Sequence, residues 1–386
     1  MYITILCKVV DNFGDIGVAW RFCRRLAKIQ SKYKINLIVD DLESFSKIEN
    51  RLLPRLTAKQ SIIIDGVEIF PWHEDDFCHD VFSQNDGEKL SLILELFQCG
   101  RPDWMEKILF EEKLNRTVHI IMIDYLTAEK YAEDFHCLQS LTRSAKVQKV
   151  NFMPGFTERT GGLVIDDVWS EVPQWNREGD VLIFTYERDW TELAAAVTKY
   201  CREGERKVLL AQGRGKESML QALKRVVALR SVQEPSVETA FVEELPYLNQ
   251  SEWDQMMKDC SALVVRGEES MSRACLSGIP FIWQAYPQSE EYQLVKVRAL
   301  LERMRQHFRK EEFEIVANAW LDINGETWIA SSLRGAERRG NPYTDFFSAI
   351  PRLIPGFRDF AASLRKNGDL CANLMTYIEK IAIIDK

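Results

Sequence analysis

Short apolar, β-branched segments alternate with segments whose apolar residues recur at helical spacing, and this alternation constrains the fold more than any other feature. In the first half of the chain, the strand-like segments are Ile3–Val10, Ile35–Val39, Ser61–Ile64 and Val118–Ile123. After residue 175 the pattern restarts, with strand-like segments at Val181–Thr185, Lys207–Ala211, Val237–Val242, Ala262–Val265 and Phe281–Trp283. Such βα order is typical of parallel sheets covered by helices on both faces. The sequence therefore predicts an α/β fold.

A break in this periodicity between residues 151 and 175 divides the chain. Prolines and glycines cluster there, and 386 residues exceed what a single hydrophobic core usually supports. We expect two Rossmann-like domains facing a central cleft, one at 1–165 and one at 166–355. Residues 356–386 are expected to form a helical tail that packs back on the N-terminal domain, and Pro351 and Pro355 to interrupt the helices of this region.

Charge and cysteine usage narrow the class of protein. A net charge of −8 argues against nucleic acid as the main partner. The nine cysteines are scattered singly, without a Cys-x-x-Cys pair, which is typical of a reduced compartment. Neither a leader pattern nor an apolar run of about 18 residues is found. The sequence predicts a cytoplasmic protein that is neither secreted nor inserted in a membrane.

Two acids and two glycines follow the first strand, in the segment from Asp11 to Gly17. A strand, a glycine-bearing turn and a helix leave backbone N–H groups in a crevice at the carboxyl end of the strand, where open α/β sheets bind ligands. We expect a loop as far as Gly17 and a helix from about Val18. The basic residues of that helix, Arg21, Arg24, Arg25 and Lys28, are interpreted as a solvated face.

The segment from Ala262 to Pro280 predicts a phosphate site in the second half. A buried strand ends at Arg266, Gly267 allows a turn, and Ser270 is a suitable N-cap for a short helix that ends at Gly278. Free N–H groups, the Ser270 hydroxyl and the Arg266 guanidinium suit a diphosphate. Glu268 or Glu269 suits sugar hydroxyls. Capping plus a surface ion pair is the alternative interpretation.

Aromatic and amide side chains follow the other strands of this half. A ring at such a position stacks on a nucleobase, and a glutamine amide pairs with the edge of the base. Several strand ends together favour a nucleotide-type ligand over simple core packing. These residues are Phe184, Tyr186, Tyr247, Gln250, Tyr286 and Gln288.

Three other functions are compatible with parts of the sequence. An NAD-dependent or other nucleotide-binding Rossmann enzyme fits the strand–glycine–helix units, although the first loop has only Gly14-x-x-Gly17 and its acids would repel a pyrophosphate. A metal-binding protein is suggested by residues 72–79, whose His and Cys spacing matches no tetrahedral zinc pattern. A non-catalytic module that only docks on another protein would not require a nucleotide-binding pocket.

Several long motifs, in order along most of the chain, resemble the protein-arginine rhamnosyltransferases known as EarP, which modify bacterial translation elongation factor P. The motifs are Val9–Arg21, Asp124–Leu126 with Ala128-Glu129, Phe152–Thr157 with Thr160–Leu163, Arg266–Glu268, Ile279–Trp283 and Tyr286–Gln288. The resemblance implies a GT-B glycosyltransferase that moves L-rhamnose, with inversion, from dTDP-β-L-rhamnose to an arginine of elongation factor P.

The resemblance also implies that 1–165 is the acceptor domain and 166–355 the donor domain, and it implies roles for single residues. Asp15 matches the general base, Asp11 the second essential aspartate, and Glu268 the essential glutamate of the second domain. Arg266, Glu269 and Ser270 match donor-binding positions, and Tyr247 stands where the family usually has a phenylalanine stacked on thymine. Donor contacts are also expected from Gly14, Phe184, Tyr186, Gln250, Tyr286 and Gln288.

The chemistry of arginine agrees with these roles. A protonated guanidinium is a poor nucleophile, and a carboxylate that holds it and accepts a proton as the C–N bond forms answers this difficulty. Asp15 fits that need. The sequence has no Asp-x-Asp motif for a metal, and Arg266 with a helix N-terminus can meet the charge of the leaving group instead. We therefore predict no metal and no cofactor.

Overall fold

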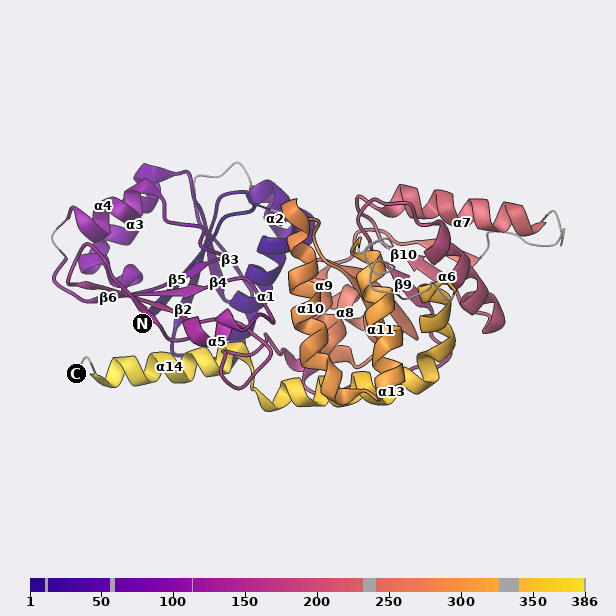
Figure 1. Cartoon of the computed structure of the whole chain (residues 1–386). Helices are drawn as coiled ribbons and strands as arrows, with labels where there is room; N and C mark the ends of the chain where they lie inside the picture. The colour runs from indigo at the N-terminus through magenta and orange to yellow at the C-terminus, as the bar shows by residue number, and fades with distance from the viewer. Residues whose placement is uncertain (11–12, 56–59, 113, 232–240, 326–339, 385–386) are drawn as a thin grey trace. The chain divides into compact units, whose positions relative to one another are not determined.

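The computed structural model describes residues 1–10, 13–55, 60–112, 114–231, 241–325 and 340–384 (Figure 1). The chain divides into two compact units. Unit 1 consists of Met1–Asp166 and Lys366–Lys386, and unit 2 is Asp167–Arg365. The predicted tail, 356–386, thus begins inside unit 2 and inside a helix. Among the described residues, no helix is both long and apolar enough to span a bilayer.

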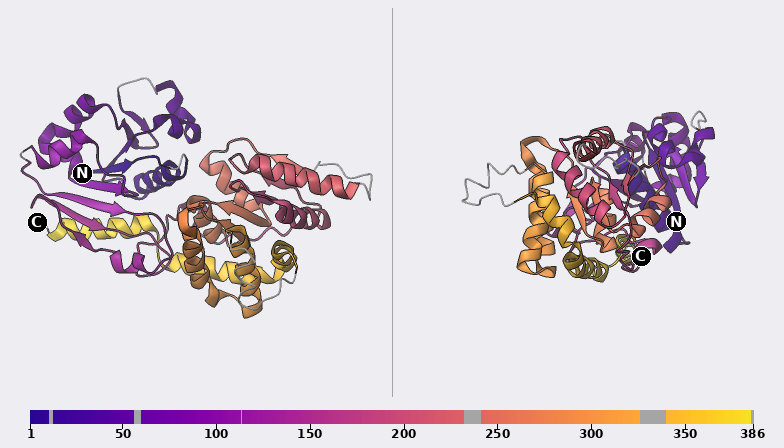
Figure 2. Two further views of the ribbon diagram at one scale, coloured as in Figure 1. Left: turned by 45° about the horizontal axis from the view of Figure 1, so that its top comes forward. Right: turned by 90° about the vertical axis from the view of Figure 1, so that its right-hand side faces the viewer.

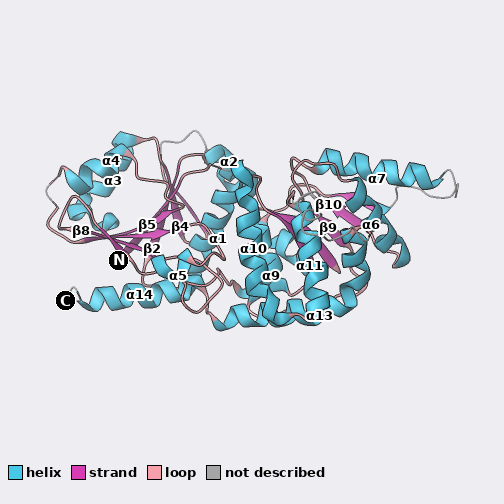
Figure 3. Cartoon of the chain, viewed as in Figure 1, coloured by secondary structure: helices cyan, strands magenta, loops and turns pink. Residues whose placement is uncertain are grey.

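A largely parallel sheet forms the centre of unit 1 (Figure 3). Its strand order is β3-β4-β2-β1-β5-β6-β8-β7. The edge strands β3 and β7 pair antiparallel to their neighbours, and all other pairs are parallel. The strands are β1 (Tyr2–Cys7), β2 (Lys34–Val39), β3 (Ile62–Ile64), β4 (Val67–Pro71), β5 (Leu92–Leu96), β6 (Val118–Ile123), β7 (Gln139–Ser140) and β8 (Val147–Asn151).

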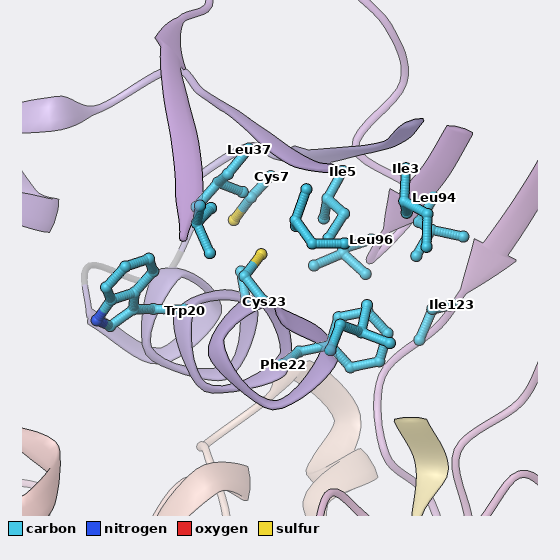
Figure 4. Packing of buried hydrophobic residues seen from close by; sticks show 14 of the residues in the cluster. Ile3, Ile5, Cys7, Trp20, Phe22, Cys23, Leu37, Leu94, Leu96 and Ile123 are labelled. Atoms are coloured by element: carbon cyan, nitrogen blue, oxygen red, sulfur yellow. The ribbon is translucent and has the colours of Figure 1, made fainter. Parts of the chain in front are cut away.

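Helices cover both faces of this sheet. On one face, α1 (Phe13–Ile29), α2 (Leu42–Ile48) and α14 (Leu370–Ile384) contribute to one hydrophobic cluster, to which β1 adds Ile3, Ile5 and Cys7 (Figure 4). On the other face, Leu6 of β1 joins a second cluster with α3 (Asp75–Gly87) and α4 (Asp103–Phe110). The alternation along β1 follows from the two-residue period of a strand. The short helix α5 (Tyr131–Phe135) precedes β7.

The last helix of the chain completes the core of the first unit. Leu370, Cys371, Leu374, Met375 and Ile378 of α14 are buried in the same cluster as α1. In Figure 2, α14 is the yellow helix that ends at the C-terminus, beside the strands of unit 1. The backbone N–H of Leu370 donates to the carbonyl of Leu163. Unit 1 is therefore built from both ends of the chain.

Unit 2 has an entirely parallel sheet in the order β11-β10-β9-β12-β13. Its strands are β9 (Val181–Ile183), β10 (Val208–Leu210), β11 (Val242–Glu244), β12 (Ala262–Arg266) and β13 (Phe281–Gln284). Its helices are α6 (Thr191–Glu203), α7 (Lys216–Ser231), α8 (Gln250–Asp259), α9 (Glu268–Ser277), α10 (Tyr292–Met304), α11 (Lys310–Ile323) and α13 (Pro342–Lys366), the last ending one residue into unit 1. With unit 1, this confirms the predicted α/β class with two Rossmann-like domains.

Some sequence predictions for the elements were wrong. Helix α13 continues through Pro351 and Pro355, because one face is buried on unit 2 while both prolines lie exposed, where water can bind the carbonyls that lose their partners. The predicted strand Val237–Val242 lies mostly outside the described residues, and β11 starts at Val242. Strands β4, β5 and β8 were not predicted, and Glu68, Glu95 and Lys149 interrupt their apolar runs.

Candidate active site

Strand order places a topological switch point in each unit. In unit 2 the chain runs from β9 outward to β10 and β11, and then returns to β12 and β13 on the other side of β9. In unit 1 the same reversal separates β1 from β5. Open α/β sheets bind ligands outside the carboxyl ends of the strands that flank such a point. Phe184, Tyr186 and Arg266 are found at these ends in unit 2, and Asp15 follows β1 in unit 1.

Arg266, the last residue of β12, lies between two aromatic rings in unit 2. Its guanidinium carbon is 4.3 Å from the ring centroid of Phe184 and 4.3 Å from that of Tyr186. Tyr286 meets the Tyr186 ring edge-on, with 5.4 Å between centroids. The backbone N–H of Tyr186 donates to Gln284 Oε1 at 2.7 Å, which fixes the segment that carries both rings. The structure thus brings together four residues predicted from separate strand ends.

Helix α9 begins earlier than the sequence predicted. Gly267 is the residue before the helix and has φ +68° and ψ −176°, a backbone conformation that essentially only glycine adopts. Glu268 and Glu269 therefore occupy the first turn, where carboxylates interact favourably with the helix dipole. The predicted N-cap role of Ser270 is wrong, because this buried residue lies inside the helix. The predicted end at Gly278, with φ +66°, is confirmed.

Basic side chains accompany both glutamates. Lys296 of α10 places its Nζ 3.1 Å from Glu268 Oε1. Arg273, which is 1% exposed, has its Nε 3.6 Å from Glu269 Oε1, one helical turn away. These cations reduce the repulsion that two adjacent carboxylates would exert on an anionic ligand. The spacing of Glu269 and Arg273 was a usable signal in the sequence, whereas nothing there pointed to Lys296.

Three further predicted donor residues lie nearer the surface. Tyr247 follows β11 and is 69% exposed. Gln250 is the first residue of α8, which Asn249 caps, and it does not lie in the loop after β11. Gln288 is exposed, and its backbone N–H donates to Gln293 Oε1.

The loop after β10 packs against the same cluster and was missed in the sequence. A Cβ atom at Gly213, whose φ is +152°, would lie 3.1 Å from Arg266 Nη2 and 3.1 Å from Phe184 Cε2. A Cβ at Gly215 would lie 2.4 Å from the carbonyl oxygen of Thr185. Both positions require glycine for close backbone approach. The signal was a Gly-x-Gly directly after a predicted strand.

In unit 1, Asp15 lies in the first turn of α1. The helix starts at Phe13 rather than near Val18, so Gly14 and Asp15 are helical and not part of a loop. The backbone N–H of Val10 donates to Asp15 Oδ2 at 2.8 Å, and Asp15 is 4% exposed. The N–H of Val9 donates to Asp40 Oδ1 at 2.8 Å, an acid that the sequence analysis missed at the end of β2. Asp11 lies outside the described residues.

Two arginines of α1 are not solvated, contrary to the sequence prediction. Arg21 is 3% exposed and pairs with Asp166, the last residue of unit 1 before the chain enters unit 2. Arg25 pairs with Asp369 at 3.0 Å, just after the chain returns. The two arginines are therefore paired with carboxylates far along the chain, and the helical pattern of the sequence does not reveal such partners.

The ends of β5 and β6 carry a second group of side chains. The Phe97 and Tyr125 rings are stacked, with centroids 4.6 Å apart and an interplanar angle of 22°. Gln98 Nε2 donates to Asp124 Oδ2 at 2.7 Å. Phe97 and Gln98 both have left-handed backbone, with φ of 55° and 54°.

The acidic segment near His79 belongs to helix α3 and its N-terminal approach. His79 Nε2 lies 2.7 Å from Glu112 Oε1, and the Cys78 thiol donates to the carbonyl of Pro71. Within the ranges that the structure describes, no three His, Cys, Asp or Glu side chains form a group able to hold a metal ion.

Comparison with known proteins relates this geometry to a family. Residues 3–379 match the family "Elongation-Factor P (EF-P) rhamnosyltransferase EarP". A protein-arginine rhamnosyltransferase of Shewanella oneidensis is 29% identical over 83% of this chain and 84% of its own length. One of Pseudomonas aeruginosa is 29% identical over 87% of this chain and 90% of its own.

A solved structure that describes EarP-mediated arginine glycosylation of translation elongation factor EF-P has the same fold. It aligns with a TM-score of 0.53 at 16% identity and covers 98% of this chain and 99% of its own. The predicted GT-B glycosyltransferase fold and the predicted family are confirmed, whereas the roles of the single site residues stay predictions. The chain belongs to the EarP family, and it is a protein-arginine rhamnosyltransferase.

Proposed function

We propose that this enzyme transfers L-rhamnose from dTDP-β-L-rhamnose to one arginine of translation elongation factor P, with inversion at the sugar carbon. The observation that carries the donor half of this proposal is the Arg266 guanidinium, stacked between Phe184 and Tyr186 beside the start of α9. A fixed planar cation and a helix N-terminus suit a diphosphate. The family relationship supports the sugar and the acceptor protein.

The predicted residues of unit 2 divide the donor between them. Tyr247 stacks on the base and Gln250 pairs with its edge, while Tyr286 and Gln288 line the remainder. Arg266 and the first N–H groups of α9, near Ser270, hold the diphosphate without a metal or other cofactor. Glu268 and Glu269 accept hydrogen bonds from sugar hydroxyls, and their partners Lys296 and Arg273 hold the two carboxylates in place.

The transfer step needs one base and one leaving group. A guanidinium nitrogen of the acceptor attacks the sugar carbon from the face opposite the diphosphate, the new C–N bond forms, and the C–O bond to dTDP breaks. The proton lost by that nitrogen passes to the Asp15 carboxylate, and dTDP leaves with the bonding electrons. Val10 fixes Asp15 by its N–H, which supports a defined orientation of the base. Asp11 assists in holding the cationic acceptor.

The cysteines indicate the compartment in which the enzyme works. All nine cysteines are free thiols, which supports a reduced compartment such as the cytoplasm, where translation takes place.

Mass spectrometry tests the proposal directly. Elongation factor P incubated with the enzyme and dTDP-β-L-rhamnose should gain one deoxyhexose on an arginine, and dTDP should appear in equal amount. Elongation factor P with that arginine replaced by lysine is the control and should stay unmodified. An unmodified wild-type factor, with the enzyme folded and dTDP bound, would refute the proposed acceptor.

A further inference from the structure

The turn after β5 has an unfavourable backbone. Phe97 and Gln98 are consecutive non-glycine residues with φ of 55° and 54°, a region that a bulky side chain such as phenylalanine rarely adopts. Glycine would adopt it freely, as Gly100 does nearby with φ 72°. Strained residues of this kind persist where the surrounding structure holds them and where their side chains are needed.

Hydrogen bonds from two backbone N–H groups hold this turn. The N–H of Phe97 donates to the carbonyl of Ile123 at 2.8 Å, which ties it to β6. The N–H of Gly100 donates to Glu95 Oε1 at 3.1 Å. Glu95 is 3% exposed and is paired with Arg101 at 2.7 Å. Contacts within unit 1 therefore hold the turn in this conformation.

The side chains of this turn contact the side chains that follow β6. The Phe97 ring is stacked on Tyr125, and Gln98 donates its amide hydrogen to Asp124 Oδ2. The other carboxylate oxygen of Asp124 accepts the N–H of Tyr125 at 2.8 Å. One carboxylate is thus fixed beside the Gln98 amide and a flat pair of rings. Each carboxylate oxygen has capacity for one more donor.

These side chains lie at the switch point of unit 1. Strands β1, β5 and β6 are neighbours and parallel, so their carboxyl ends meet at one edge of the sheet. The segment after β1 that leads to Asp15 begins at this edge. Phe97 also packs against the hydrophobic cluster to which α1 belongs, so it lies on the same face of the sheet as the helix that carries Asp15.

We propose that Phe97, Gln98, Asp124 and Tyr125 form the acceptor-binding site, which recognises the arginine of the protein substrate. A guanidinium is planar and stacks on an aromatic face, and it donates in a fork to a carboxylate and a neighbouring amide oxygen. An ammonium group has no such plane. The site thus selects arginine over lysine. This inference rests on the proposed function, because the acceptor is the arginine of elongation factor P.

Steady-state kinetics with elongation factor P as the varied substrate, at saturating dTDP-rhamnose, test the inference. Asp124→Asn and Tyr125→Ala should each raise the KM for elongation factor P by about tenfold, as expected for a lost contact to a charged group. The affinity for dTDP should not change, because the donor residues belong to unit 2. Tyr125→Phe, which keeps the ring, should recover most of the loss seen in Tyr125→Ala.

Gln98→Gly separates binding from stability. It relieves the left-handed strain and removes the amide, so the unfolding temperature should rise while the KM for elongation factor P also rises. The matched control is Asp86→Asn. Asp86 is also left-handed, with φ 58°, and its carboxylate accepts the N–H of Asn115, but it lies at the end of α3, at the opposite edge of the sheet. Its substitution should leave the kinetics unchanged.

The outcomes distinguish this inference from the proposed function. If wild-type enzyme transfers rhamnose and Asp124→Asn, Tyr125→Ala and Gln98→Gly keep the wild-type KM, the inference is wrong and the proposed function stands. If these variants lose stability and kcat without a change in KM, the residues are structural and the inference is again wrong. If the wild-type enzyme transfers no rhamnose, the proposed function fails and the inference falls with it.

Discussion

Replacing Arg266 by lysine tests the central geometric feature of the donor site. The substitution keeps the positive charge, but it removes the planar guanidinium that lies 4.3 Å from the centroids of two rings. If charge alone attracts the diphosphate, Arg266→Lys should bind dTDP as the wild type does. If the stacked plane positions the hydrogen-bond donors, the variant should bind more weakly.

The size of the effect follows from the contacts. A partly buried cation–π contact contributes about 1 kcal/mol, so the loss of both contacts should weaken the free energy of dTDP binding by about 2 kcal/mol. At 1.4 kcal/mol for each factor of ten, the Kd for dTDP should rise about 30-fold. Arg266→Met, which also removes the charge, should weaken binding further.

Calorimetric titration with dTDP measures this directly, and the chain offers a matched control. The Arg206 guanidinium lies 4.4 Å from the centroid of the Tyr200 ring, in the same unit but before β10, at the amino edge of the sheet. Arg206→Lys therefore removes a similar contact away from the site and should leave dTDP affinity unchanged. Wild-type affinity in Arg266→Lys, or an equal loss in both variants, would refute the reasoning.

Four further outcomes are expected. Asp15→Asn should abolish transfer, measured by mass spectrometry, with dTDP affinity nearly intact, since an amide oxygen still accepts the Val10 N–H; normal turnover would remove Asp15 from the role of base. Tyr247→Ala should weaken dTDP binding by one to two orders of magnitude, taking base stacking at about 1–3 kcal/mol, and unchanged affinity would mean that the base stacks elsewhere. Gly213→Ala should lower both the unfolding temperature and dTDP affinity, because its Cβ meets the Arg266 guanidinium and Phe184 at 3.1 Å; equal values for variant and wild type would show that the loop is not tightly packed. Burial raises the pKa of the Cys23 thiol above its ordinary 9.0, so above pH 9 the unfolded state loses a proton that the folded state keeps. The free energy of unfolding should therefore fall as pH rises, by up to about 1.4 kcal/mol per pH unit for this thiol. Urea titrations at pH 8 and 10 should show a smaller fall in Cys23→Ala than in the wild type.

Much of the fold could be predicted because burial leaves a regular pattern in the sequence. Strands with uninterrupted apolar runs, such as β9 and residues 262–265 of β12, were found, and the order of the strands in the chain predicted a parallel sheet. Strand β5 escaped because Glu95 stands within it, and this carboxylate is compatible with burial only through partners outside the strand, Arg101, Lys149 and the Gly100 N–H. Likewise, the burial of Arg21 depends on Asp166, far along the chain.

The candidate site was predictable to the extent that it depends on strand ends. Arg266, Phe184, Tyr186 and Tyr286 meet because parallel strands bring their carboxyl ends to one edge. The start of α9 was misplaced because a serine three residues later is also a good cap. The pairing of Lys296 with Glu268 joins two separate helices, and no local spacing encodes such a contact.

The chain order of the two units has a consequence for how the protein folds during synthesis. Unit 2 is one continuous segment, whereas unit 1 needs residues from 366 onward, whose apolar side chains complete the core around α1. Domains usually fold in the order in which they are made. Here the first unit to be translated is the last to be finished, because its core stays open until α14 arrives. A premature stop near residue 365 would thus expose the core of the unit that carries Asp15 and leave the donor-binding unit intact.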